Sequence, residues 1–193
     1  MRYMDWDVLL FPHGSHIPIK EFRVACYLQQ ERLDSVGVPI LTAFVPSLPD
    51  HTPFQVSVHS WVKPQAILGG NNAGYAPGTT YQWRVNVKAD GKVLSSETFA
   101  EDVTWPKQIG ITPPGGDPSV KVLLTFPVFD KRILSQSHWN ACDDQGRIKV
   151  ELSAGYQFNG GYINLVDHVI FAFQPAPMEL LQRSGIAWPH ANM

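Results

Sequence analysis

Two pairs of side chains along the chain have the spacing of metal ligands. His13 and His16 are three residues apart, and His138 and Cys142 are four residues apart. Together they would offer three imidazoles and a thiolate, which is a tetrahedral set suited to zinc. The usual two-cysteine knuckle is missing, and loop histidines are more often plain surface residues than ligands. We therefore expect no metal and no other cofactor, and keep these four residues only as metal candidates.

Two polar side chains in an apolar stretch are the candidates for catalysis. Asp167 and His168 interrupt residues 163–173, which are otherwise mostly apolar on both faces. A strand of this kind is typically covered on both sides, and a buried carboxylate or imidazole needs a partner. That partner is either a substrate or the backbone of a neighbouring loop, and the sequence leaves both interpretations open.

A second polar pair, Ser57 and His59, shares one face of an expected strand. Two residues along a strand set their Cβ atoms about 7 Å apart, which is long for the hydrogen bond between a nucleophile and its base. We interpret this pair as polar residues on a solvent-exposed face. The chain also lacks the Gly-X-Ser-X-Gly elbow and the P-loop lysine, so neither that kind of hydrolase nor a nucleotide site is indicated.

The chain contains six tryptophans. Trp6 and Trp83 fall on expected core faces, whereas the other four fall on an outward face or in loops: Trp61, Trp105, Trp139 and Trp188. Exposed rings of this size can anchor a protein partner or stack on sugars. The alternative is that such rings fold back over the open ends of a β-sandwich.

The elements that must position these residues are strands. Residues 80–88 alternate between apolar and polar side chains, which indicates a strand with one buried face. The Asp90-Gly91 dipeptide follows with the positive-φ chemistry of a tight turn, and a partner strand returns to residue 99. Similar alternation later in the chain predicts that three strands share one core, made of Tyr81, Trp83, Val85, Val87, Ile148, Val150, Leu152, Val169, Phe171 and Phe173.

Apolar runs separated by turn signals recur from residue 6 to residue 173. Pro177 is well placed to begin a short helix over residues 178–184, which Gly185 closes. We predict a mainly β fold, an antiparallel β-sandwich or jelly roll, with one short C-terminal helix and a single domain over residues 1–193.

Two parts of this assignment carry specific expectations. Residues 22–28 as a strand would bury Cys26 in the core, although the same residues also fit a helix that begins at Pro18. Alternation over residues 120–126 predicts a further buried row. Two glycine- and proline-rich stretches, residues 63–78 and 106–118, are longer than a hairpin needs and are the expected binding surfaces.

Composition narrows the function classes. Charged residues make up only 17% of the chain, the net charge is −2 and no basic cluster occurs, so we expect no nucleic-acid partner. No apolar run approaches the roughly 20 residues of a membrane span, and the N-terminus lacks a secretory pattern. With only two cysteines, expected to be reduced thiols, these features predict a cytoplasmic or nuclear protein that does not bind membranes.

Four segments resemble a known pattern. Residues 44–49 (FVPSLP), 54–61 (FQVSVHSW), 83–92 (WRVNVKADGK) and 185–189 (GIAWP) are similar to small uncharacterised fungal β-sandwich proteins. The resemblance implies a sandwich and a fungal, intracellular origin. Because that family has no assigned activity, it transfers no catalytic residue.

Three functions fit these observations. An interaction or regulatory module that binds a protein partner through aromatic-rich loops comes first, because no catalytic set accompanies the aromatic residues. A small-molecule-binding jelly roll, or a non-hydrolytic enzyme of the isomerase or cyclase type, is the alternative, since such a site needs a cavity and few ionisable groups. A glycan-binding module is the third.

Overall fold

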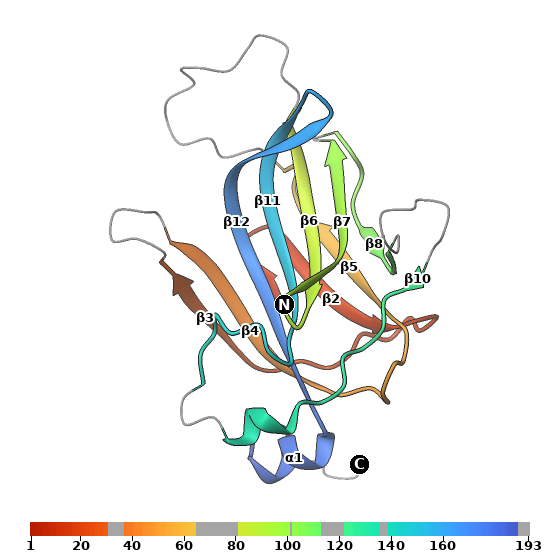
Figure 1. The fold of residues 1–193 in the computed structure, drawn as a ribbon, viewed down its shortest axis with the longest axis vertical. Coiled ribbons are helices and arrows are strands. Elements are labelled where there is room, and N and C mark those ends of the chain that lie inside the picture. The colour runs from red at the N-terminus through yellow and green to blue at the C-terminus, as the bar shows by residue number, and fades with distance from the viewer. Residues whose placement is uncertain (31–36, 65–80, 101, 113–121, 136–138, 189–193) are drawn as a thin grey trace.

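The computed structural model describes residues 1–188, except for residues 31–36, 65–80, 101, 113–121 and 136–138. Two β-sheets form most of this part of the chain, and one short helix lies at their lower end in Figure 1. The inner faces of the two sheets contribute to one hydrophobic core. The prediction of a mainly β sandwich with a short C-terminal helix is confirmed.

The smaller sheet has four strands in the order β1-β2-β5-β8, all paired antiparallel. These strands are β1 (Arg2–Tyr3), β2 (Trp6–Pro12), β5 (Phe54–Ser60) and β8 (Lys107–Ile109). A separate two-stranded ribbon joins β9 (Ile111–Thr112) to β10 (Val122–Leu123).

The larger sheet has six strands in the order β3-β4-β12-β11-β6-β7. Its strands are β3 (Phe22–Gln29), β4 (Val38–Pro46), β6 (Tyr81–Ala89), β7 (Lys92–Ala100), β11 (Ile148–Phe158) and β12 (Gly161–Ala176). A 3-10 helix over Lys131–Ser135 and α1 (Met178–Arg183) complete the regular elements. Strands β4 and β12 run parallel, so the sheet is mixed rather than wholly antiparallel as predicted.

The β6–β7 hairpin forms as its sequence predicts. Asp90 and Gly91 both have positive φ, at 50° and 73°, which gives a tight turn between the two strands. The apolar face of β6 is buried in the core together with the predicted residues of β11 and β12. Tyr81 is the exception among the ten predicted core residues, because it lies at the end of β6 and is only half-buried.

Two predictions about strands are wrong. The row expected over residues 120–126 forms only the two-residue β10, and Val122 is exposed there, although Leu124 and Phe126 are buried. Residues 22–28 do form a strand, β3, but Cys26 is exposed instead of buried. A bulge between Phe22 and Ala25 breaks the simple alternation that the sequence suggested, and β3 lies at the edge of its sheet.

The C-terminal helix matches its prediction closely. Pro177 precedes the first turn of α1, and Gly185 follows it with a φ of 63°. Leu181 of this helix packs with Ala176 and Ala187 in a small core of its own. Among the described residues, no helix is long and apolar enough to cross a membrane.

Candidate functional site

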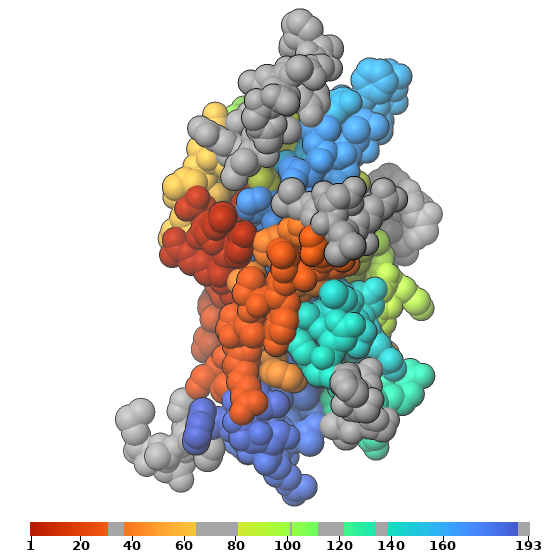
Figure 2. All heavy atoms as spheres, turned by 90° about the vertical axis from the view of Figure 1, so that its left-hand side faces the viewer, coloured from red at the N-terminus to blue at the C-terminus, as the bar shows by residue number. Residues whose placement is uncertain are grey.

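The two edges of the six-stranded sheet differ in chemistry. Strand β3 exposes apolar side chains, with Val24 54% and Leu28 63% exposed. Strand β7, at the opposite edge, carries mainly polar and charged residues, although Val93 is 56% exposed. Within the described part of the chain, no strand pairs with the outer side of β3. Figure 2 shows the orange β3 region at the surface, in the middle of the left-hand face of Figure 1.

A shallow groove of about 410 Å³ lies against β3 and β4. We call it the β3 groove, and its lining includes Arg23, Val24, Tyr27, Phe44 and Trp139. The Trp139 ring lies 5.3 Å from the ring of Tyr27 and 6.3 Å from that of Phe44, measured between centroids. One aromatic residue from each strand therefore meets an indole from a distant loop, which makes a rigid apolar wall beside the open edge.

A buried arginine holds Trp139 in this wall. The guanidinium of Arg147 lies 4.7 Å from the centre of the indole ring. It donates a hydrogen bond of 2.9 Å to Gln174 Oε1 and one of 2.8 Å to the Ala141 carbonyl. Burial lowers the pKa of Arg147, and the nearby carboxylate of Asp143 acts in the opposite direction. The cation is thus held by oriented dipoles and an aromatic face, and it fixes the loop that carries Trp139.

The predicted tryptophans have different environments. Trp61 is 58% exposed, lies 5.4 Å from the Arg2 guanidinium and stacks on His59. Trp105 instead packs against the core, 5.0 Å from the ring of Trp6 and 5.3 Å from that of Phe99. Its position is the one expected of a ring that folds back over the end of the sandwich.

Ser57 and His59 are within hydrogen-bond distance of each other, although the spacing along the strand suggested that they are too far apart. Ser57 Oγ lies 3.0 Å from His59 Nε2, because both side chains lean toward each other along the face of β5. Ser57 is nevertheless buried, so a substrate cannot reach its hydroxyl without a rearrangement of the sheet. We interpret the pair as a structural hydrogen bond rather than an activated nucleophile.

Asp167 and His168 lie on opposite sides of β12. In the register with β11, Leu152 pairs with Val169 and Ser153 pairs with Asp167. His168 is therefore the additional residue of a β-bulge, a feature that redirects a side chain and that alternation in the sequence cannot reveal.

The bulge leaves Asp167 exposed on the outer face, where its carboxylate accepts a 2.8 Å hydrogen bond from Asn164. The expectation that this residue is buried is wrong. His168 is half-buried and lies among the rings of Tyr3, Trp6 and Trp83. The two residues cannot act on one substrate as an acid–base pair, since they face different pockets.

The metal candidates are not gathered by the fold. His13 and His16 are exposed in the turn after β2, and Cys142 lies above the outer face of the other sheet, where its carbonyl accepts a hydrogen bond from Lys149. His138 lies outside the described residues. Among the residues that are described, no three histidine, cysteine, aspartate or glutamate side chains could hold a metal ion together.

Of the two long stretches expected to form binding surfaces, residues 65–78 of the first and 113–118 of the second lie outside the described residues, and the described part of the second contains β8 and β9. The β3 groove lies elsewhere. Only Trp139 pointed to it from the sequence, because the exposure of β3 follows from its place at the sheet edge rather than from a motif.

Comparison with known proteins gives a family for this arrangement. A family model described as a domain of unknown function (DUF8498) matches residues 1–187. The chain belongs to this family. No curated protein and no solved structure matches it. Because the description of DUF8498 names no activity, the function of the chain must be argued from its own surfaces.

Proposed function

We propose that this member of the DUF8498 family is a binding module that takes up an extended segment of a partner protein along β3. The observation that carries the proposal is the contrast between the two edges of the six-stranded sheet. Proteins usually protect edge strands with charged residues, prolines or short length, because an open edge recruits other strands. Both edge strands contain a bulge, and β7 also carries Lys92 and Glu97, whereas β3 presents Val24, Tyr27 and Leu28 to solvent.

Main-chain hydrogen bonding would supply the first part of the affinity. In strand addition, the peptide backbone pairs with the edge strand, and alternate side chains of the peptide enter pockets beside it. Beyond the bulge, residues 25–29 of β3 are regular and can pair with a short extended segment.

Side-chain recognition would come from the β3 groove. Tyr27, Phe44 and Trp139 suit an apolar or aromatic side chain of the partner, since rigid rings contribute contact area at low entropic cost. Arg23 is the charged residue of the groove lining, and it is exposed. We therefore propose a partner segment with an apolar anchor and a neighbouring acidic residue.

The proposal includes a reducing compartment, the cytoplasm or the nucleus. Cys26 and Cys142 support it, because both are free and exposed thiols. We also propose a fungal origin, which the resemblance to fungal β-sandwich proteins supports. The family match itself names no organism.

Peptide selection tests this function. Random dodecapeptides displayed on phage are panned on the wild-type protein and counter-selected on the Val24→Lys variant. We expect enriched peptides to combine alternating apolar residues with an acidic residue, and to lose at least about tenfold in affinity for Val24→Lys.

Val93→Lys is the matched control, because it places the same substitution at a similarly exposed valine on the opposite edge of the sheet. Enriched peptides should bind it as they bind the wild type. The proposal is overturned if no peptide sequence is enriched, or if the two lysine variants weaken binding equally while both retain the wild-type melting temperature.

A further inference from the structure

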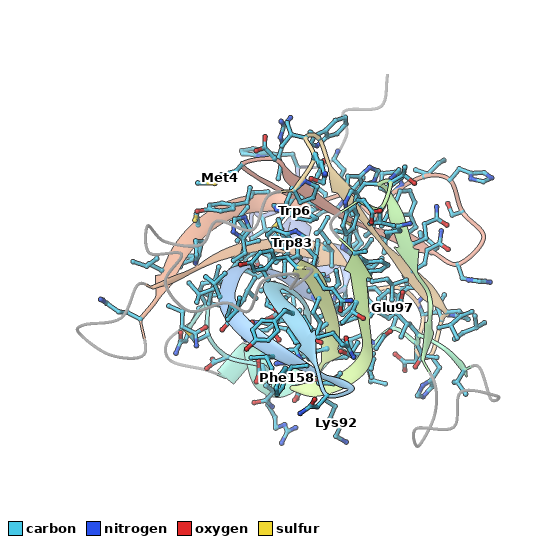
Figure 3. The ribbon with its side chains drawn as sticks, turned by 90° about the horizontal axis from the view of Figure 1, so that it is seen from above. Met4, Trp6, Trp83, Lys92, Glu97 and Phe158 are labelled. Carbon is cyan, nitrogen blue, oxygen red and sulfur yellow. The ribbon has the colours of Figure 1, made fainter. Side chains whose placement is uncertain are left out.

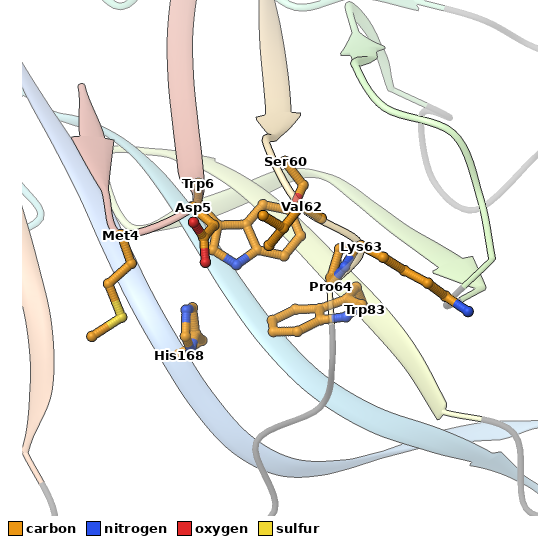
Figure 4. A pocket seen from close by; sticks show the side chains of 9 residues that line it. All are labelled: Met4, Asp5, Trp6, Ser60, Val62, Lys63, Pro64, Trp83 and His168. Carbon is orange, nitrogen blue, oxygen red and sulfur yellow. The ribbon is translucent and has the colours of Figure 1, made fainter.

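A second cavity, separate from the β3 groove, lies between the two sheets. This end pocket has a volume of about 450 Å³, and its lining includes Asp5, Trp6, Ser60, Val62, Trp83 and His168. Trp6 and Ser60 belong to the smaller sheet and Trp83 and His168 to the larger one, whereas Asp5 and Val62 lie outside the strands (Figure 4). A volume of this size is within the range of small-molecule sites, and the open end of a β-structure is a common place for one.

Two tryptophans form the floor of the end pocket. The rings of Trp6 and Trp83 lie 4.7 Å apart between centroids, and only 3% and 2% of these residues are exposed. Seen from above, they are neighbours in the middle of the molecule, whereas Met4 lies further out (Figure 3). The two ring planes are inclined by 56°, so the floor is an apolar angle between two indoles that the core fixes.

The β-bulge in β12 places His168 in the wall. Its ring centroid lies 5.4 Å from that of Trp83, with the two ring planes at 83°. Burial lowers the pKa of His168 from its ordinary value of 6.5, so the imidazole is uncharged at neutral pH. An uncharged imidazole offers one hydrogen-bond donor and one acceptor.

The floor also offers hydrogen-bond donors. Trp83 Nε1 is buried and has no hydrogen-bond partner among the described residues. In Figure 4 the indole nitrogen of Trp6 points toward the space between His168 and Trp83. An indole N–H can only donate, and a buried donor without an acceptor is costly, so an acceptor in the pocket would be stabilising.

The charged groups at the rim of the pocket do not favour a ligand of either charge. Asp5 and Lys63 both line the pocket and have opposite charges. The Lys63 side chain extends away from the two indole rings in Figure 4. A charged ligand on the floor would lose its hydration next to Trp6 and Trp83 without gaining an ion pair there.

We propose that the end pocket binds an uncharged planar aromatic molecule that carries a hydrogen-bond acceptor. The ring of the molecule packs parallel to one indole of the floor and against the edge of the other, and its acceptor receives a hydrogen bond from an indole nitrogen or from His168. This site is distinct from the β3 groove, and neither proposal depends on the other.

Titration followed by NMR tests this site. In a ¹H–¹⁵N spectrum of the uniformly labelled protein, the indole Nε1–H groups give separate signals, assigned by single Trp→Phe variants. Acetophenone is the probe, because it has a planar ring and a carbonyl acceptor. We expect the signals of Trp6 and Trp83 to shift saturably, with a Kd on the order of 1 mM for so small a molecule.

Two further compounds serve as matched controls. Cyclohexyl methyl ketone keeps the carbonyl but lacks the flat ring, and benzoate keeps the ring but adds a charge. Both should cause shifts at least about fivefold smaller at equal concentration. The proposal is overturned if all three compounds act alike, or if the signals of Trp139 and Trp188 shift as much as those of the pocket.

A variant that fills the pocket gives an independent test. Ser60→Leu places a larger side chain at the mouth and should abolish the acetophenone shifts, whereas Val93→Lys should preserve them. The spectrum of each variant reports directly whether it is folded. Unchanged binding by a folded Ser60→Leu variant contradicts the assignment of the site.

Discussion

At the scale of single residues, the tryptophans show how strongly environment decides function. Trp6 and Trp83 are buried between the sheets, and Trp105 packs against Trp6 from the side. Trp61 and Trp139 remain accessible, but Trp139 also stacks on a buried cation. Only the accessible rings can contribute to binding without a structural cost when they are removed.

Substitution of these tryptophans by alanine should separate the two roles. Trp83→Ala is expected to lower the free energy of unfolding by about 3–5 kcal/mol, because it leaves a large cavity in the core. Trp105→Ala should lower it by about 2 kcal/mol or more, since the ring packs against Trp6 and Phe99. Trp61→Ala should change it by less than about 0.5 kcal/mol, as is usual for an exposed residue.

Urea denaturation of the three variants measures these differences. The order Trp83, Trp105, Trp61 is the essential result. A loss for Trp61→Ala as large as that for Trp105→Ala would show that its ring also supports the fold.

His168 should make stability depend on pH. Its pKa is lowered by burial in the folded chain, so below pH 6.5 the unfolded chain binds more protons than the folded chain. The stability that comes from the neutral ring is therefore complete above pH 6.5 and is lost as the pH falls below that value.

His168→Phe removes this titration and keeps an aromatic ring in place. Between pH 7.5 and pH 5.5, the free energy of unfolding should fall more steeply for the wild type than for the variant, as measured by urea denaturation at both pH values. The neighbours Asp5, Tyr3 and Trp83 are present in both proteins, so their effects cancel. Parallel slopes would show that His168 titrates normally.

At the scale of elements, irregular strands position both candidate sites. The bulge in β3 occurs at Arg23, which has a φ of 49°, and the bulge in β12 occurs at His168. Each places a polar side chain at the rim or wall of an apolar cavity. Because bulges redirect side chains and end regular pairing, they commonly occur next to functional surfaces.

The loop that carries Trp139 should depend on Arg147. Arg147→Lys keeps the charge but cannot donate at the same time to Gln174 Oε1 and to the Ala141 carbonyl. We expect a loss of about 1–3 kcal/mol in the free energy of unfolding, together with a shift of the Trp139 indole signal in the NMR spectrum.

Arg183→Lys is the matched control for this substitution, because Arg183 is exposed in α1 and should tolerate lysine. If Arg147→Lys leaves both the stability and the Trp139 signal unchanged, the arginine does not hold the loop, and the β3 groove must be rigid for another reason.

At the scale of the whole molecule, local patterns predicted the strands but not their arrangement. The β6–β7 hairpin, the core face of β11 and the helix after Pro177 depend on neighbouring residues, so the sequence was sufficient for them. The parallel pairing of β4 with β12 joins segments more than a hundred residues apart, and no local signal specifies it. With β12 on one side of β4, β3 takes the other side, and among the described strands the sheet ends there.

The candidate sites could be predicted only in part, because they too depend on contacts between segments that are distant in the sequence. Trp139 and His168 were identified by residue type, but their neighbours were not, because the groove and the end pocket are assembled from distant strands. The prediction that Cys26 is buried was wrong because it assumed regular alternation, whereas β3 contains a bulge and lies at the edge of its sheet.

The reactivity of the two thiols tests whether β3 and the segment that carries Cys142 are exposed in the folded protein. Both cysteines are free and exposed, so a thiol reagent should modify two groups in the native protein without denaturant. A peptide bound along β3 should slow modification of Cys26, which lies within that strand. Recovery of no thiols in the unreduced protein would reveal a disulfide and would reject the compartment proposed above.

Amide hydrogen exchange with and without a selected peptide is the most direct test of the central claim. Strand addition at β3 should slow exchange of amides within residues 22–29, because those on the open side of the strand gain hydrogen-bond partners. Exchange of β7 should stay as it is in the free protein. Protection of β7 instead, or binding without any protection of β3, would contradict the proposal that β3 is the partner-binding edge.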